Sequence, residues 1–370
     1  MEEMYISYRP TKNTLASRLT CLSVLAFCLF LVAACGQEAS VGQAQTEQEG
    51  QAKAERKNQQ RRLGSDAPIR YKEAAEWPIQ ALSAAGFPAG PWNFIQVPSV
   101  AMNSNGNVLL FHRGADPILE FSPDGKFLGT WGDILSISEG KVVFIPEENR
   151  GNGTRYTAVY GPAGCTACGA HAIHVDHEGN VWVVDAAAHV VYKMDSQGEE
   201  VLMQVGTKGE AGSGPKNFNI PTDVAIASNG NIYVSDGYGS ARIVKFAKDG
   251  KFLLEFGKRG TGPGEFGMPH NVAVDNQERV YVSDRDNGRV EVFDSNGKFL
   301  KEWAGTGGAS VLAMTKDQHL WVGNVLFDLD GKPVGRLPGN SAGHGGMALA
   351  PNGDNYVAYL NGTAKRFVKQ

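Results

Sequence analysis

The chain has 370 residues, of which 42% are hydrophobic and 20% are charged, and its formal net charge is −4. This composition is ordinary for a globular protein, and the slight acidity argues against a general nucleic-acid binder, which carries a basic patch or stripe. Glycine is frequent, with 46 residues. No collagen-like period accompanies it, so we expect many turns between short strands.

Residues 1–34 are predicted to be a bacterial lipoprotein signal peptide. Basic residues precede the apolar run "LTCLSVLAFCLFLVAAC" (19–35), whose end resembles a lipobox. That resemblance implies cleavage before Cys35 and lipidation of its sulfur. Gln37 replaces the aspartate that retains some lipoproteins at the inner membrane, so we expect an outer-membrane anchor facing the periplasm. The alternative is an uncleaved transmembrane anchor, although the run is shorter than the ~20 residues that a span needs.

Residues 35–65 are predicted to be a flexible tether, and residues 66–370 a single folded domain. The tether is rich in Gln, Glu, Ala and Lys and has too few apolar residues to fold alone. Within the domain, Cys165 and Cys168 form the sequence "CTAC". A local disulfide is the favoured prediction in an oxidising compartment. A redox pair is the less favoured alternative, because no helix signal follows the second cysteine.

A unit of four short strands repeats along the domain. Its second strand recurs as "NVLLFHR" (107–113), "NVWVVDA" (180–186), "NIYVSDG" (231–237), "RVYVSDR" (279–285) and "HLWVGNV" (319–325). A sixth, shorter unit spans residues 347–370, and the segment around "EWPIQ" (76–80) is expected to supply its missing outer strand. Four strands per unit and a period of about 40–50 residues predict an all-β, six-bladed propeller.

Three histidines share one position in this repeat. The first strand of a blade lines the central channel, so the residue that enters this strand lies near the axis. This residue is His171 in blade two, His270 in blade four and, with one extra residue in the blade, His344 in blade six. Imidazoles from alternate blades can converge into a three-histidine metal site with an open fourth position, which is typical of catalytic zinc. The alternative is that each histidine fills a strand entry independently.

Three further residues are predicted to reach the same rim of the channel. Arg113 and Arg285 share one position just after the second strand, and Tyr238 lies beside the equivalent position of blade three. The forked guanidinium group of arginine suits a carboxylate. A tyrosine near positive charge can serve as a base, because the charge lowers the phenol pKa. The alternative is that these are ordinary rim residues.

The units resemble NHL repeats, and a more specific resemblance rests on "FHRG", "AHAIHVD", "VSDGYGSARIVKF", "MPHNVAVD" and "VSDRDNGRV". These motifs are similar to those of the peptidyl-α-hydroxyglycine α-amidating lyases. The resemblance implies a carbon–nitrogen lyase in which His171, His270 and His344 bind zinc and Tyr238, Arg113 and Arg285 are catalytic. The implied reaction cleaves an N-acyl-α-hydroxyglycine, such as a peptide ending in α-hydroxyglycine, into an amide and glyoxylate.

The sequence also departs from this family. A structural calcium ion is implied by the resemblance, with backbone carbonyls that match Val100 and Ile173. The aspartate that would complete its site is replaced by Gly345 and Gly346, which argues against calcium. We expect a monomer. We also expect its hydroxylated substrate to be made elsewhere, because no copper monooxygenase domain is recognisable in the sequence. The competing hypothesis is a non-catalytic NHL propeller that binds a protein or glycan partner at the cell envelope. A calcium-dependent lactonase ranks last, since its Glu, Asn and Asp ligands are absent from the strand entries.

Overall fold

The computed structural model describes residues 67–75, 77, 96–113, 117–131, 169–339, 343–360 and 362–370, and the backbone of 143–147 and 155–159. The predicted signal peptide and tether lie outside these residues, as do Cys35, Cys165 and Cys168. None of the described residues forms a helix, so none of them forms a helix that could cross a membrane.

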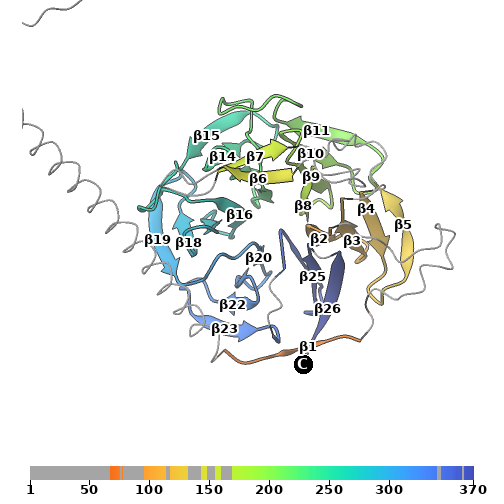
Figure 1. The fold of residues 1–370 in the computed structure, drawn as a ribbon. Helices are drawn as coiled ribbons and strands as arrows, with labels where there is room; N and C mark the ends of the chain where they lie inside the picture. The colour runs from red at the N-terminus through yellow and green to blue at the C-terminus, as the bar shows by residue number, and fades with distance from the viewer. Residues whose placement is uncertain are drawn as a thin grey trace, which may run out of the picture. The chain divides into compact units, whose positions relative to one another are not determined.

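Six four-stranded antiparallel sheets form the described domain, which confirms the predicted six-bladed propeller. Figure 1 shows the six sheets arranged as blades of one ring. Blade one consists of β2 (Ser99–Met102), β3 (Val108–Phe111), β4 (Ile118–Phe121) and β5 (Phe127–Trp131). Blade two consists of β8 (Ala170–Val175), β9 (Val181–Asp185), β10 (Val190–Met194) and β11 (Val201–Val205). Blade three consists of β12 (Asp223–Ile226), β13 (Ile232–Asp236), β14 (Arg242–Phe246) and β15 (Phe252–Phe256).

Blades four to six complete the ring. Blade four consists of β16 (Pro269–Val274), β17 (Val280–Asp284), β18 (Arg289–Phe293) and β19 (Phe299–Ala304). Blade five consists of β20 (Leu312–Met314), β21 (Leu320–Val322), β22 (Val325–Phe327) and β23 (Pro333–Arg336). Blade six consists of β24 (Met347–Leu349), β25 (Asn355–Tyr359), β26 (Thr363–Lys369) and β1 (Tyr71–Glu73). A separate hairpin of β6 (Val143–Glu147) and β7 (Arg155–Val159) lies in the sequence between blades one and two.

The N-terminal part of the domain closes the ring, but not with the predicted segment. The outer strand of blade six is β1, which pairs antiparallel with the last strand, β26. The prediction placed this strand around residues 76–80, and it was therefore a few residues too late. Trp77, from the predicted segment, is buried and packs edge-on against Tyr356 with ring centroids 4.8 Å apart. The predicted segment therefore supplies a buried aromatic side chain next to β25, and not the outer strand of blade six.

The hydrophobic core lies between neighbouring blades. Valine, tyrosine and tryptophan side chains of the second and third strands are almost fully buried, and they form separate clusters between pairs of blades. The second strands β9, β13 and β17 are buried along their whole length, whereas every second residue of the outer strands β15 and β5 is exposed. The six first strands are therefore held rigidly around the axis, where the predicted site residues lie.

Candidate metal centre

β-Bulges place two of the three predicted histidines in the channel. The pairing register shifts at His171 in β8 and again at His270 in β16. A bulge leaves one residue out of the strand ladder and re-aims its side chain. Both imidazoles are fully buried. The sequence pattern located these residues but did not predict the bulges that orient them.

A turn before β24 places the third histidine. The backbone N–H of His344 donates to the carbonyl of Ala358 in β25, and Gly346 N–H donates to the carbonyl of His344. Gly345 has a φ of +74°, and a Cβ there would lie 2.3 Å from the carbonyl oxygen of Pro98. Glycine is therefore required at this point, where the turn takes up the extra residue of blade six.

The three histidines converge from alternate blades. Each offers a ring nitrogen that lies within 4.8 Å of those of the other two. The ring centroids are 5.1 Å apart for His171 and His270, 5.5 Å for His171 and His344, and 4.9 Å for His270 and His344. Among the described residues, the buried Nδ1 atom of His344 has no hydrogen-bond partner.

These imidazoles are neutral at physiological pH. Burial, reinforced by the charges of nearby Arg113 and Arg285, lowers the pKa of His344 to about 3. Burial and neighbouring positive charge also lower the pKa values of His171 and His270 well below 6.5. Neutral imidazole is the form that binds metal ions, so the donor set fits a divalent ion such as zinc.

Hydrogen bonds fix the tautomers of two of these histidines. Nδ1 of His171 lies 2.5 Å from the carbonyl oxygen of Thr222, and Nδ1 of His270 lies 2.9 Å from Oδ1 of Asn271. Both partners are acceptors, so each Nδ1 carries the proton. The unprotonated Nε2 atoms of both rings then carry the lone pairs that could bind a metal ion.

Tyr238 lies over this cluster. Its hydroxyl group is 3.1 Å from Nε2 of His171 and 3.3 Å from Nε2 of His270. The aromatic ring is buried and belongs to a cluster with Ala186, Ile220 and Met268. The phenol oxygen is therefore held beside the ring nitrogens that would bind a metal ion.

The two predicted arginines flank the histidines. Arg285 places its guanidinium carbon 5.9 Å from the centroid of the Tyr238 ring, and its Nε donates to Asp286. Arg113 is buried, and its guanidinium group donates to the carbonyl of Ala170 and to the side chain of Gln96. The structure thus brings all six predicted metal-binding and catalytic residues into one region around the axis.

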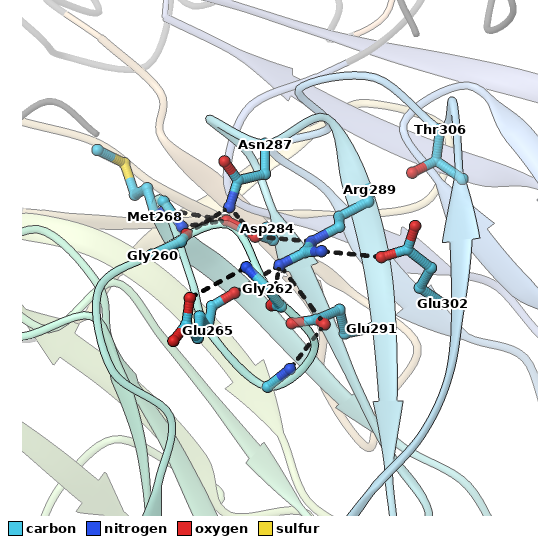
Figure 2. Close-up of polar contacts among 12 residues, drawn as sticks. Gly260, Gly262, Glu265, Met268, Asp284, Asn287, Arg289, Glu291, Glu302 and Thr306 are labelled. Atoms are coloured by element: carbon cyan, nitrogen blue, oxygen red, sulfur yellow. Dashed lines mark hydrogen bonds and ion pairs between the residues drawn. The ribbon is translucent and has the colours of Figure 1, made fainter. Parts of the chain in front are cut away.

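A buried ionic cluster holds the loop that leads to His270. Figure 2 shows Arg289 between Asp284 and Glu302, with its guanidinium group donating to the carbonyls of Gly262 and Glu265. Asp284 accepts hydrogen bonds from the backbone N–H groups of Gly267 and Met268. The loop 258–268 is therefore fixed immediately before β16, the strand that carries His270.

Sequence reasoning missed the residues that support the site. Asn271 and the Thr222 carbonyl orient two histidines, and Met268 packs against Tyr238. A signal for Asn271 was present, because it directly follows a strand-entry histidine. Comparing the repeat at this next position would have shown it among three polar residues, with Ser99 and Asp223.

The residues present do not fit a calcium ion at the predicted carbonyls of Val100 and Ile173. A Cβ at Gly346 would lie 2.2 Å from Oγ of Ser99, so a carboxylate side chain there would require the Ser99 side chain to move. Oγ of Ser99 instead accepts a hydrogen bond from the backbone N–H of Ile173. The buried carboxylate of Asp223 already has His174 and Asn271 as partners.

Comparisons with known proteins agree with the fold. The model of a family described as "6-bladed beta-propeller" matches residues 218–324. The chain is 34% identical over 249 residues to a rat protein named peptidylglycine alpha-amidating monooxygenase, covering 64% of this chain and 24% of that protein.

Two further relatives carry related names. A Caenorhabditis elegans protein named "Probable peptidyl-alpha-hydroxyglycine alpha-amidating lyase" is 32% identical over 162 residues, which cover 43% of each chain. A mouse protein named NHL repeat-containing protein 3 is 34% identical over 217 residues, covering 55% of this chain and 54% of the relative. The chain spans about a quarter of the rat protein and about half or less of the other two. It is a six-bladed β-propeller homologous to proteins named for peptide α-amidation.

Proposed function

We propose that this protein is a zinc-dependent lyase that cleaves an N-acyl-α-hydroxyglycine into an amide and glyoxylate. The observation that carries the proposal is the contact of the Tyr238 hydroxyl group with Nε2 of both His171 and His270. This contact joins a candidate base to a candidate metal site. The names of the homologous proteins supply the reaction class.

The reaction needs a base at the substrate hydroxyl group. Loss of the hydroxyl proton lets the C–O bond become C=O while the C–N bond breaks, and the amide nitrogen recovers a proton. A divalent cation held by the three histidines would lower the pKa of a hydroxyl group and make this proton easier to remove. Tyr238, as the phenolate, would receive the proton, because its oxygen lies beside the same ring nitrogens.

The arginines suit the charge of the substrate. An α-hydroxyglycine carries a carboxylate next to the carbon that reacts. The guanidinium groups of Arg113 and Arg285 are close enough to the histidines to lower their pKa values. Either group can bind a carboxylate through paired N–H donors, and its charge also stabilises the negative charge that develops as the bond breaks.

The test is an assay for glyoxylate release by the purified full chain from a simple N-acyl-α-hydroxyglycine. We expect release above the spontaneous rate, loss of release after chelation and recovery on addition of zinc. A folded, zinc-binding protein without release would contradict the proposed reaction while leaving the metal site. A folded protein with neither property would instead favour a non-catalytic binding propeller.

A further inference from the structure

A second layer of buried polar residues lies one position after the strand entries. The residues at this position, in blade order, are Ser99, Ala172, Asp223, Asn271, Val311 and Gly345. The three polar members, Ser99, Asp223 and Asn271, have no exposed surface. Buried polar groups require partners, and these partners show what the layer does.

Asn271 uses its side chain to join three parts of the propeller. Its Nδ2 donates to Oδ2 of Asp223 at 3.0 Å and to the backbone carbonyl of Gly345 at 2.8 Å. Its Oδ1 accepts from Nδ1 of His270 at 2.9 Å. The amide orientation is unambiguous, because the carboxylate and the carbonyl can only accept.

These contacts act on two of the three histidines. The acceptor Oδ1 keeps the proton of His270 on Nδ1, so that Nε2 presents its lone pair to the cluster. The bond to Gly345 restrains the residue that directly follows His344. His171 does not depend on Asn271, because the backbone carbonyl of Thr222 fixes its ring.

Asp223 anchors Asn271 in turn. The carboxylate of Asp223 is fully buried, and its Oδ1 lies 2.6 Å from Nε2 of His174. Its Oδ2 also accepts from the backbone N–H of Val272 at 3.1 Å. Burial alone would lower the pKa of His174, but the neighbouring Asp223 carboxylate raises this pKa above its usual value. The amide of Asn271 is therefore held by a buried carboxylate of blade three, which also contacts the partly exposed His174 of blade two.

We propose that Asn271 is the positioning residue of the metal site, setting the tautomer of His270 and the backbone beside His344 so that both imidazoles can bind one ion. The inference rests on the proposed function only in taking the histidine cluster as a metal site. It does not depend on the substrate. Groups that orient metal-binding histidines typically change metal affinity 10–100-fold when they are removed.

The experiment compares two substitutions with a control. Zinc affinity of the full chain is measured by competition with a chromophoric chelator. We expect Asn271→Ala to weaken zinc binding about 10–100-fold. Asn271→Asp retains an oxygen that accepts from His270, but it replaces the donor to Asp223 and Gly345 by a second oxygen, so we also expect weaker zinc binding than in wild type. Asn355→Ala removes another buried asparagine, from β25, and is expected to leave affinity unchanged.

A second measurement uses no metal. The ¹⁵N chemical shifts of the histidine rings in the metal-free protein report which nitrogen is protonated. We expect the Nδ1–H tautomer for His270 in wild type and in Asn271→Asp, and loss of this preference in Asn271→Ala.

Several results would overturn the inference. These are an Nε2–H tautomer of His270 in wild type, unchanged zinc affinity in a folded Asn271→Ala protein, or an unchanged His270 tautomer in that protein. If Asn271→Ala does not fold, the wild-type tautomer of His270 decides. A wild-type protein that binds zinc without releasing glyoxylate would contradict the proposed reaction and leave this inference intact.

Discussion

The phenol oxygen of Tyr238 lies where the histidine cluster and the arginine charges meet. Replacement by phenylalanine removes only this oxygen, because the ring keeps its packing against Ile220 and Met268. We expect Tyr238→Phe to lower the rate of glyoxylate release by about 10²–10⁴-fold, the usual contribution of a general base. Zinc affinity should stay within a few-fold, since a phenylalanine leaves all three histidines in place.

The assay compares kcat for the two proteins at saturating zinc, with circular dichroism to show that both are folded. A Tyr238→Phe protein that retains more than a tenth of the wild-type rate would remove Tyr238 from the role of base. An inactive protein that has also lost its zinc would show that Tyr238 supports the site rather than the chemistry.

At the level of single elements, matching ionic clusters hold the loops before β12 and β16. In blade four, Arg289 pairs with Asp284 and donates to carbonyls of loop 258–268. In blade three, Arg242 pairs with Asp236 and donates to the carbonyls of Ser213 and Asn217. The two loops flank Tyr238, since the carbonyl of Ile220 accepts from its backbone N–H and the side chain of Met268 packs on its ring.

These clusters predict a reciprocal pattern of proteolysis. Lysine cannot reproduce the forked contacts of arginine, so we expect Arg289→Lys to cost about 2–3 kcal/mol and to speed trypsin cleavage at the exposed Lys258. The matched substitution Arg242→Lys should instead speed cleavage at Lys208 and Lys216, which are exposed in the other loop. Mass spectrometry of timed digests measures both. Cleavage that rises equally at all three lysines in either variant would indicate general destabilisation and no local clamp.

Glu291 distinguishes the blade-four cluster from its counterpart, where Val244 occupies the same position of the repeat. The carboxyl group accepts from Gly264 N–H, and its other oxygen is buried without a partner among the described residues. Burial raises the pKa of Glu291 from 4.5 to about 7, against the opposing effects of Gly264 and Arg289. Since the folded pKa is above the unfolded one, stability is lost as pH rises through this range.

The Glu291→Gln substitution tests this pH dependence. Glutamine does not titrate, so the fall in Tm between about pH 5 and pH 8 should be smaller than in wild type, by the equivalent of roughly 1–2 kcal/mol. Thermal unfolding at several pH values in one ionic strength measures the difference. Parallel Tm curves for the two proteins would mean that Glu291 keeps an ordinary pKa.

The repeat pattern predicted the blades and the approximate place of each site residue, because strand alternation and strand-entry positions recur locally in the sequence. It did not predict the bulges at His171 and His270, since a bulge depends on how a strand pairs with its neighbour. The link from Asn271 to Gly345 was also hidden, because 74 residues separate the two in the chain. Such contacts follow from closure of the ring and not from the pattern within one blade.

For the whole molecule, membrane attachment through Cys35 stays a proposal that depends on the N-terminal sequence motif. We expect Cys35→Ala to abolish incorporation of labelled palmitate and to block signal-peptide cleavage, because both reactions require the cysteine sulfur at the cleavage site. Metabolic labelling and the apparent mass of the protein in cells measure these effects. Label retained by the Cys35→Ala protein, or normal processing without label in wild type, would contradict a lipid anchor.

Closure of the ring joins the two ends of the described domain. Tyr71 of β1 is buried and packs edge-on against Trp321 of blade five at 5.5 Å, while β1 pairs with β26 in blade six. Arg336 of blade five adds to this junction, because its backbone N–H donates to the carbonyl of Pro68 and its side chain to that of Ala67. Residues 67–73 therefore connect blades five and six as well as completing a sheet.

A chain that begins at residue 76 should lose this connection, whereas one that begins at residue 66 should keep it. Loss of the buried Tyr71 ring alone is expected to cost about 3–5 kcal/mol, and the unpaired edge of β26 should promote self-association. Thermal unfolding and light scattering of the two truncated chains measure both effects, and Lys72→Ala, at an exposed position of β1, serves as the control. Equal Tm values for the two chains would mean that five blades and a three-stranded sixth blade are stable without β1. The histidine site would then not depend on ring closure, although its three histidines come from blades two, four and six.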